Sequence, residues 1–246
     1  MSGHSRWAGI KHKKAVIDKK RGKIFTKIIR EITIAAKAGG GNADHNPRLR
    51  AAIDSAKAVN MPSDNIKKAI QRGTGELPGV VFEELQYEGY GPGGVAVMCD
   101  VTTDNKNRTA SEIRRLFSTN NGSMGENGCV SWMFKQKGNI TILKKDAQED
   151  KLMSLVLDAG AEDMQTDEDV YEIVTDPVDF EKIKEMIIKS NISIESSEIT
   201  MLPQTYISLS GKEAEQMIRL MEALEDSDDI RNVYANFEIA PDELPI

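Results

Sequence analysis

The sequence predicts an α+β protein with a small N-terminal helical bundle and two further α+β domains, one inserted in the other. Residues 18–73 show only helical patterns, whereas the chain after the glycine-rich linker at 75–79 alternates strand and helix patterns. At 246 residues the chain is long enough for two or three compact cores. The expected domains are 1–76, 77–136 together with 203–246, and 137–202.

The first predicted helix runs over residues 18–38. Asp18 serves as its N-cap, and three consecutive glycines from Gly39 end it. At about 100° per residue, apolar side chains fall on one side of this helix and basic side chains on the other. We expect the apolar side to pack and the basic side to be exposed. The basic side consists of Lys20, Lys23, Lys27, Arg30 and Lys37.

Two shorter helices complete the bundle. One begins after the N-cap residue Asn46, with Pro47 in its first position, and runs to Asn60. The other spans about 62–72 and is expected to end at Gly73. Their core side is supplied by Leu49, Ile53, Ala56, Ile66 and Ile70.

Residues 138–200 predict a ferredoxin-like unit, because their elements follow the order βαββαβ. The flanking segments contain the same kinds of element, so we expect this unit to be inserted into a related one. The inserted unit has strands at 139–143, 170–175 and 192–199, a further strand before 170, and helices at 147–158 and 178–189. The flanks have strands at 82–88, 94–101, 129–135, 204–209 and 230–238, and helices at 106–119 and 211–225.

Charge is divided unequally along the chain. Residues 1–76 hold 17 Lys and Arg against 6 Asp and Glu, a net charge of +11, whereas residues 77–246 hold 15 against 33, a net charge of −18. Net charge governs partners more than fold, so this asymmetry indicates a polyanionic partner for the N-terminal part.

Residues 2–16 predict a flexible basic arm, because they have too few apolar positions to bury a helical face. Crowded cations repel one another, and that repulsion is relieved when they bind the phosphates of a nucleic acid and displace its condensed counterions. Trp7 could stack on an unpaired base, and His12 could donate to phosphate. The predicted nucleic-acid contacts of the arm and first helix are Arg6, Trp7, Lys11, His12, Lys13, Lys14, Lys19, Lys20, Arg21, Lys23, Lys27 and Arg30.

Three other interpretations of the basic segment remain open. A mitochondrial targeting peptide is also basic and poor in acids, but Gly9 and the lysines at 11–14 interrupt an amphipathic presequence. A merely solvated basic face is the second. The third is an anionic membrane surface, for which the arm lacks the large apolar side of an interfacial helix.

The sequence does not predict an enzyme, a cofactor, a metal site or a small-molecule substrate. It contains no GxxxxGK[ST], HExxH, GxSxG or calcium-loop motif. The glycine-rich run at 89–94 joins two predicted strands, so it favours a hairpin turn over a phosphate cradle. Cys99 and Cys129 form no disulfide framework, and no signal peptide or membrane span is evident, which favours a cytoplasmic protein.

Four motifs, in this order along the chain, are similar to those of the YebC family. The first is Gly3-His4-Ser5-Arg6-Trp7 followed by Ile10-Lys11-His12-Lys13. The others are Tyr87-Glu88-Gly89-Tyr90-Gly91-Pro92-Gly93-Gly94, Thr103-Asp104-Asn105-Lys106-Asn107-Arg108-Thr109 and Gly122-Ser123-Met124-Gly125-Glu126-Asn127-Gly128. The resemblance covers nearly the whole chain, with mild departures such as Lys106 where the family commonly has Arg.

The resemblance implies a three-domain protein that regulates gene expression without catalysis. Members are described as probable transcriptional regulators or as ribosome-associated translation factors that relieve stalling, and a mitochondrial relative activates translation of a cytochrome oxidase subunit. By this resemblance Asn105, Asn107, Arg108 and Met124 are expected to contact RNA or the ribosome. RNA is favoured over DNA, because no helix-turn-helix recognition helix stands out. The alternative is a protein-interaction scaffold in which the basic arm is incidental.

Overall fold

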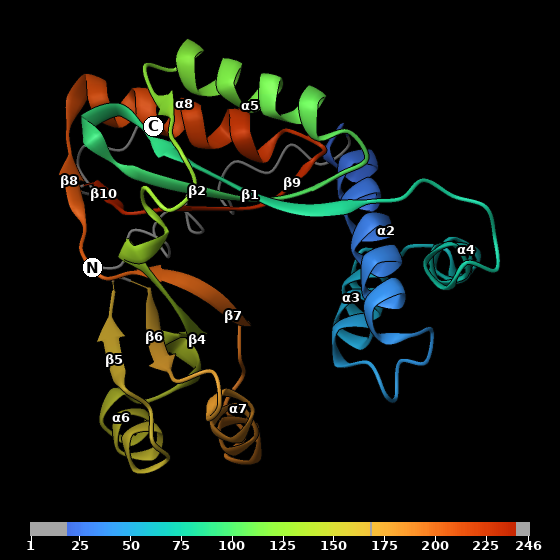
Figure 1. Cartoon of the computed structure of the whole chain (residues 1–246). Coiled ribbons are helices and arrows are strands. Elements are labelled where there is room, and N and C mark those ends of the chain that lie inside the picture. The colour runs from blue at the N-terminus through green and yellow to red at the C-terminus, as the bar shows by residue number, and fades with distance from the viewer. Residues whose placement is uncertain (1–18, 168, 240–246) are drawn as a thin grey trace.

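The computed structural model describes residues 19–167 and 169–239 (Figure 1). The predicted basic arm lies outside these residues. Three helices form the N-terminal region, and two antiparallel four-stranded sheets follow, each with helices against one face. The coarse prediction of an α+β protein with an N-terminal helical region is therefore confirmed. None of the described helices combines the length and the low polarity needed to cross a membrane.

The helical region consists of α2 (Lys19–Gly39), α3 (Pro47–Ala58) and α4 (Ser63–Thr74). Asn46 caps α3 as predicted, since its Oδ1 accepts from the Leu49 N–H at 3.1 Å. Its Nδ2 donates to the carbonyl of Ala35 at 2.7 Å, which ties α3 to the end of α2. The core of this region is built from Ile32, Ala35, Ala36, Leu49, Ala52, Ala56, Met61 and Ala69.

Gly73 does not end α4, contrary to the prediction. The helix continues to Thr74, and Gly75 follows it with a left-handed φ of 82°. Gly73 is instead a contact position, because a Cβ there would lie 2.7 Å from the Cβ of Ala36. The small residue lets α4 approach α2 closely.

The first sheet has the order β3-β1-β2-β9, with every neighbouring pair antiparallel. It consists of β1 (Glu83–Tyr90), β2 (Ala96–Thr103), β3 (Ser123–Met124) and β9 (Ile230–Ala235). Helices α5 (Lys106–Thr119) and α8 (Gly211–Glu225) cover one of its faces (Figure 1). Beside it, β8 (Ile207–Leu209) and β10 (Phe237–Ile239) pair in parallel.

The second sheet has the order β5-β6-β4-β7 and is also antiparallel throughout. Its strands are β4 (Phe134–Leu143), β5 (Asp163–Thr166), β6 (Val170–Thr175) and β7 (Ser196–Pro203). Helices α6 (Glu149–Asp158) and α7 (Phe180–Lys189) pack on one face. The element order is the βαββαβ order that the sequence predicts for this part of the chain.

The separate strands predicted at 129–135 and 139–143 are wrong. A 3-10 turn, η2 (Ser131–Met133), is followed by the single strand β4, which runs through Gly138. In the sequence, Gly138 suggests that one strand ends and another begins. In the structure, the glycine is required inside a continuous strand. A Cβ at this position would lie 2.5 Å from Cδ2 of Phe180, which packs there from α7.

Two lobes extend from the face of the first sheet that α5 and α8 leave uncovered (Figure 1). The helical region lies at one end of that sheet and the second sheet at the other. A small apolar cluster joins the two sheets near the start of β4. It contains Ala96, Met98, Val130, Phe134 and Tyr234.

Candidate nucleic-acid interface

The predicted nucleic-acid contacts are divided between residues that the structure describes and residues that it does not. Arg6, Trp7 and the predicted cations at 11–14 lie outside the described residues. Lys19, Lys20 and Arg21 belong to the first turn of α2, but the description does not extend to their side chains. The described candidates are Lys23, Lys27, Arg30, Asn105, Asn107, Arg108 and Met124.

Lys23, Lys27 and Arg30 project from α2 toward the connection between α8 and β9. The Lys23 ammonium lies 3.1 Å from the Asp226 carboxylate, and Lys27 donates to the Glu225 carbonyl at 2.6 Å. The last carbonyls of a helix lack partners within the helix and carry partial negative charge, so cations stabilise them. The basic side of α2 therefore caps the end of α8.

Arg30 contradicts the prediction of a fully exposed basic side, because its side chain is only 16% exposed. Its Nη1 donates to the Asp228 carbonyl at 2.5 Å and to the Asp229 carboxylate at 2.7 Å. The periodicity of α2 correctly identifies its two sides. The sequence could not show that an acidic segment about 200 positions away covers the basic one.

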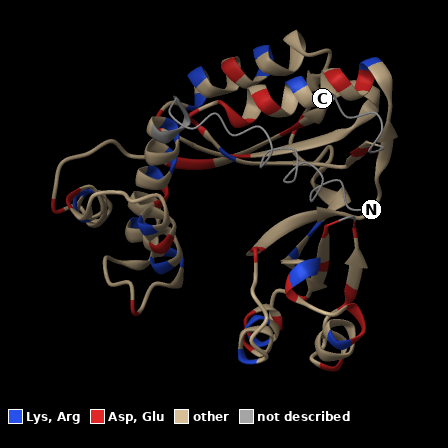
Figure 2. Ribbon diagram, turned by 180° about the vertical axis from the view of Figure 1, so that it is seen from behind, with Lys and Arg blue, Asp and Glu red and all other residues tan. Residues whose placement is uncertain are grey.

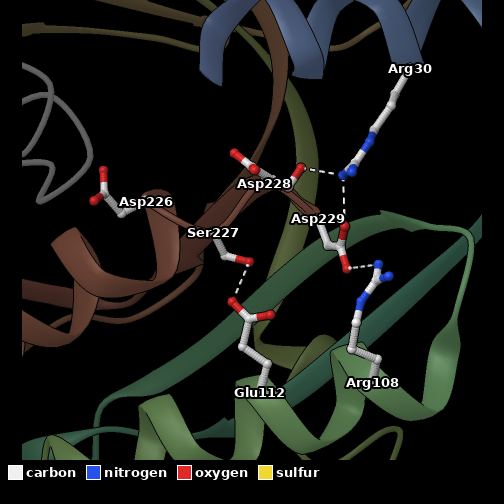
Figure 3. A pocket seen from close by; sticks show the side chains of 7 residues that line it. All are labelled: Arg30, Arg108, Glu112, Asp226, Ser227, Asp228 and Asp229. Atoms are coloured by element: carbon white, nitrogen blue, oxygen red, sulfur yellow. Dashed lines mark hydrogen bonds and ion pairs between the residues drawn. The ribbon is translucent and has the colours of Figure 1, made fainter. Parts of the chain in front are cut away.

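The Asp229 cluster, defined as Arg30, Thr103, Arg108, Thr109 and Asp229, is centred on a carboxylate that is 5% exposed. Its Oδ2 accepts from Arg108 at 2.9 Å and from Thr109 at 2.5 Å. Burial raises the pKa of Asp229, but the hydrogen bonds from Thr109 and Arg108 and the charge of Arg30 outweigh it and hold this pKa below its ordinary value. Figure 3 shows both arginines reaching the same carboxylate.

The other residues at the start of α5 have different environments. Asn105 caps α5, because its Oδ1 accepts from the Arg108 N–H at 3.1 Å. Arg108 also pairs with Asp104 at 2.7 Å, and its hydrogen bonds to Asp229 and Asp104 raise its pKa. Asn107 is exposed in the first turn. The fold thus brings Arg30 and Arg108 together, and it gives Asn105 a role in helix capping.

A pocket of about 380 Å³ opens beside the Asp229 cluster. Ser227 donates to Glu112 across it at 3.0 Å. Carboxylates outnumber guanidinium groups in the lining, which disfavours a phosphate inside the pocket itself. The lining side chains, labelled in Figure 3, are Arg30, Arg108, Glu112, Asp226, Ser227, Asp228 and Asp229.

A second group of charges, which the sequence analysis missed, attaches the helical region to the first sheet. We define the Glu31 cluster as Glu31, Arg48, Glu84 and Arg231. Arg48 lies 2.7 Å from Glu31 and 2.6 Å from Glu84, and Arg231 lies 3.0 Å from each carboxylate. Burial raises the pKa of Glu31, but Arg48 and Arg231 outweigh it and lower that pKa.

Other cations of the helical region face solvent. Lys67, Lys68 and Arg72 are exposed on α4, and Lys37 is exposed at the end of α2. Lys68 and Arg72 stand four residues apart, so they lie on the same side of the helix. Figure 2, which shows the molecule from behind, has Lys and Arg positions in blue on both α2 and α4. This spacing in the sequence is the signal that identifies the α4 cations.

Met124 is half-buried in β3 and packs against the core of the first sheet. The glycine-rich loop after it is held by Glu88, another residue that the sequence analysis missed. The buried Glu88 carboxylate accepts from the N–H groups of Gly128 at 2.7 Å, Val130 at 2.7 Å and Ser131 at 2.8 Å. Burial raises the pKa of Glu88, but these hydrogen bonds outweigh it and lower the pKa.

No group of three or more His, Cys, Asp or Glu residues is placed to hold a metal ion within residues 19–167 and 169–239. The arrangement offers charge and hydrogen-bond donors.

Comparison with known proteins gives matches over almost the whole chain. The model for the TACO1/YebC protein N-terminal domain matches residues 5–76, and the model for the TACO1/YebC second and third domain matches residues 82–237. A probable transcriptional regulatory protein of Endomicrobium trichonymphae is 57% identical over 246 residues, covering 99% of this chain and 98% of the relative. One from Geobacter sulfurreducens is 57% identical over 244 residues, with the same coverage.

A solved structure has the same fold. The crystal structure of a conserved hypothetical protein from Aquifex aeolicus superimposes with a TM-score of 0.85 at 47% sequence identity. The match covers 98% of this chain and 100% of the other.

Proposed function

The chain belongs to the TACO1/YebC family, and from this premise we propose that it is a non-enzymatic regulator of gene expression that binds nucleic acid. RNA, alone or in the ribosome, is the favoured target, and DNA is the second. The description of the relatives as probable transcriptional regulatory proteins supports a nucleic-acid partner for them and hence for this chain.

The observation that carries the proposal is the net charge of +11 on residues 1–76, within a chain whose remainder is strongly acidic. Phosphate contacts by Lys and Arg release condensed counterions, which drives binding irrespective of sequence. Lys67, Lys68 and Arg72 are exposed on α4 and are available for such contacts.

The candidate contacts fall into three groups. Arg6, Trp7 and the basic residues from Lys11 to Arg21 remain the proposed primary contacts, together with the α4 cations. Lys23, Lys27, Arg30 and Arg108 already bind acidic groups or carbonyls of the chain, so phosphate would have to compete for them. Asn107 and Met124 remain candidates of lower rank, since Met124 is half-buried.

RNA is favoured over DNA because the exposed side of α4 offers phosphate-binding side chains more than base-reading ones. Sequence-specific DNA helices present Asn, Gln and Arg to base edges in the major groove. On α4, Arg72 is the one exposed side chain of these types, since Asn65 and Gln71 are half-buried, and the other exposed cations are Lys67 and Lys68. Recognition of a folded RNA depends more on shape, phosphate and unpaired bases.

We also propose the domain division 1–76, 77–136 with 203–246, and 137–202. Its support is that β4, α6, β5, β6, α7 and β7 form one sheet with its own helices, between segments that belong to the first sheet. The boundary at 136 falls inside β4, which begins at Phe134, so the first residues of that strand belong with the inserted unit. The strand order β5-β6-β4-β7 supports a ferredoxin-like classification for this unit.

Ultraviolet cross-linking in cells, followed by sequencing of the recovered nucleic acid, tests the target. The proposal expects enrichment of ribosomal or messenger RNA with the wild-type chain. Recovery of promoter DNA without ribosomal RNA would contradict the preference for RNA. Recovery of no nucleic acid above the level of an uncross-linked control would contradict the function itself.

A protein-interaction scaffold is the second candidate. The observation that favours it is that three cations of α2 bind the chain's own 225–229 segment, so part of the positive charge has an internal partner. Neutralising Lys11, Lys13 and Lys14 separates the two functions. A scaffold would keep its nucleic-acid affinity unchanged, whereas a nucleic-acid-binding protein would lose affinity.

A further inference from the structure

Trp132 is the most exposed aromatic side chain of the described residues, at 67%. Tryptophan usually buries most of its surface in a soluble protein, so this exposure calls for a physical reason. Trp132 lies in η2, at the junction where the chain passes from the first sheet into β4 (Figure 1).

The indole is held in place although it is exposed. Its Nε1 donates to the Cys129 carbonyl at 3.1 Å, and the Tyr90 hydroxyl donates to the same carbonyl at 3.1 Å. Tyr90 is itself 36% exposed. Two aromatic rings therefore converge with their polar ends on one oxygen atom, which leaves their apolar surfaces partly open to solvent.

The backbone beneath these rings is fixed from two sides. Glu88 binds the N–H groups of Gly128, Val130 and Ser131, which bracket Cys129. The Gln204 side chain donates to the Trp132 carbonyl at 2.9 Å, and the Gln204 N–H donates to the Met133 carbonyl at 2.9 Å. The exposure of Trp132 is thus a property of an ordered turn, and little entropy remains to be lost when a ligand stacks on it.

We infer that Trp132, supported by Tyr90, is a stacking site for an unpaired RNA base. Aromatic rings bind single-stranded nucleic acid by stacking on bases, whose flat faces match an open ring. The inference rests on the proposed RNA-binding function and adds to it a second contact, at the end of the first sheet opposite the helical region.

A base fits the surroundings better than an apolar protein surface does. A protein interface needs a contiguous apolar centre around its anchoring aromatic residues. Here the neighbouring loop is polar and exposed at Asn127 and Gly128, and Lys135 and Gln136 are exposed at the start of β4. Polar side chains beside a stacked base can bind its edge, and Lys135 can approach a phosphate.

The test uses the full-length chain and an unstructured single-stranded RNA of roughly 12 nucleotides. We expect Trp132→Ala to weaken binding by at least about 5-fold, the lower limit for loss of one stacked base. Trp132→Phe, which retains a ring, should stay close to wild type. Val178→Ala is the matched control, because Val178 is 88% exposed in another part of the molecule.

A second readout does not depend on the stability of the alanine variant. In a Trp7→Phe background Trp132 is the only tryptophan, so its fluorescence reports on this site alone. Stacking predicts quenching at saturating single-stranded RNA, and little change with an RNA duplex of the same length, whose bases are already paired.

The outcomes separate this inference from the proposed function. Wild-type RNA binding with unchanged Trp132 fluorescence, or with equal affinity of Trp132→Ala, would overturn the stacking site and leave the proposed function standing. Absence of RNA binding by the wild-type chain would overturn both. Quenching on addition of a protein from the same cells, without quenching by RNA, would mean that the site binds a protein and would likewise overturn the inference.

Discussion

At Asp229 two arginines from distant parts of the sequence share one carboxylate. Arg30 comes from α2 and Arg108 from α5, and both threonine donors of the cluster reach the same Oδ2. Both arginines were predicted as nucleic-acid contacts. A buried carboxylate with this many donors is costly to alter, because each donor would lose a charged partner.

We expect Asp229→Asn to lower the free energy of unfolding by about 1.5–3 kcal/mol, the usual contribution of hydrogen bonds to a charged group. Urea unfolding measures the effect. Asp228→Asn is the control, since Asp228 is exposed and contributes its carbonyl to the contact with Arg30. Equal effects of the two substitutions would contradict the central role of the Asp229 carboxylate.

Glu172 on β6 provides a prediction about pH. Burial, with a smaller contribution from Asp167, raises its pKa to about 7, and its Oε1 has no hydrogen-bond partner among the described residues. The native state therefore binds a proton more tightly than the unfolded state, so the stability that Glu172 contributes is present at low pH and lost as pH rises toward 7.

Replacing Glu172 by Gln removes this titration. Between pH 5 and pH 8, we expect the wild type to lose on the order of 1–3 kcal/mol of unfolding free energy relative to Glu172→Gln. Thermal or urea unfolding of both proteins across this range measures the difference. Parallel pH profiles would show that the Glu172 carboxyl is not perturbed.

At the scale of elements, predictions were accurate where the signal is local. Asn46 and Pro47 fix the start of α3, and the order of strands and helices from β4 to β7 follows the sequence pattern. Gly73 and Gly138 led to wrong boundaries because their role is to make room for another element. That role depends on which helix packs there, and no local pattern contains this information.

The candidate site was predictable only in part for the same reason. Periodicity identifies the basic side of α2, but not the carbonyls and carboxylates of the 225–229 segment that meet it. Glu88 and Arg231 could not be singled out, since their importance comes from backbone N–H groups and carboxylates that the fold brings to them from elsewhere in the chain.

Gly138→Ala tests the contact between β4 and α7. A Cβ at position 138 would lie 2.5 Å from Phe180, so we expect a loss of about 1–3 kcal/mol in unfolding free energy from overpacking. Adding Phe180→Leu should restore part of the lost unfolding free energy, because the smaller side chain leaves room for the Cβ. If the double variant is no more stable than the sum of the two single effects predicts, contact with the Phe180 ring is not the cause of the loss.

At the scale of the whole molecule, polar contacts attach the helical region to the first sheet. The Asp229 cluster joins α2 to the α8–β9 connection, and the Glu31 cluster joins α2 and α3 to β1 and β9. Charged contacts of this kind weaken with salt more than an apolar interface would. The position of the basic region is therefore set by the acidic remainder of the chain.

Arg231→Met should loosen this attachment. It leaves Glu31 and Glu84 with Arg48 as their remaining partner in the Glu31 cluster. We expect a larger radius of gyration by small-angle X-ray scattering, with a further increase at high salt. The matched control is Arg219→Met, which removes a surface pair with Glu215 on α8. An unchanged radius for Arg231→Met would mean that the cluster does not hold the region in place.

The salt dependence of RNA affinity tests the central claim most directly, because its slope reports how many phosphates the protein neutralises. For single-stranded RNA each neutralised phosphate contributes roughly −0.7 to the slope of log affinity against log salt concentration. Neutralising Lys11, Lys13 and Lys14, or separately Lys67, Lys68 and Arg72, should weaken binding and make this slope shallower by about 0.7 for each phosphate that is no longer bound. A steep wild-type slope that both sets of substitutions reduce is the predicted result. A slope that neither set changes would contradict nucleic-acid binding by the basic N-terminal region.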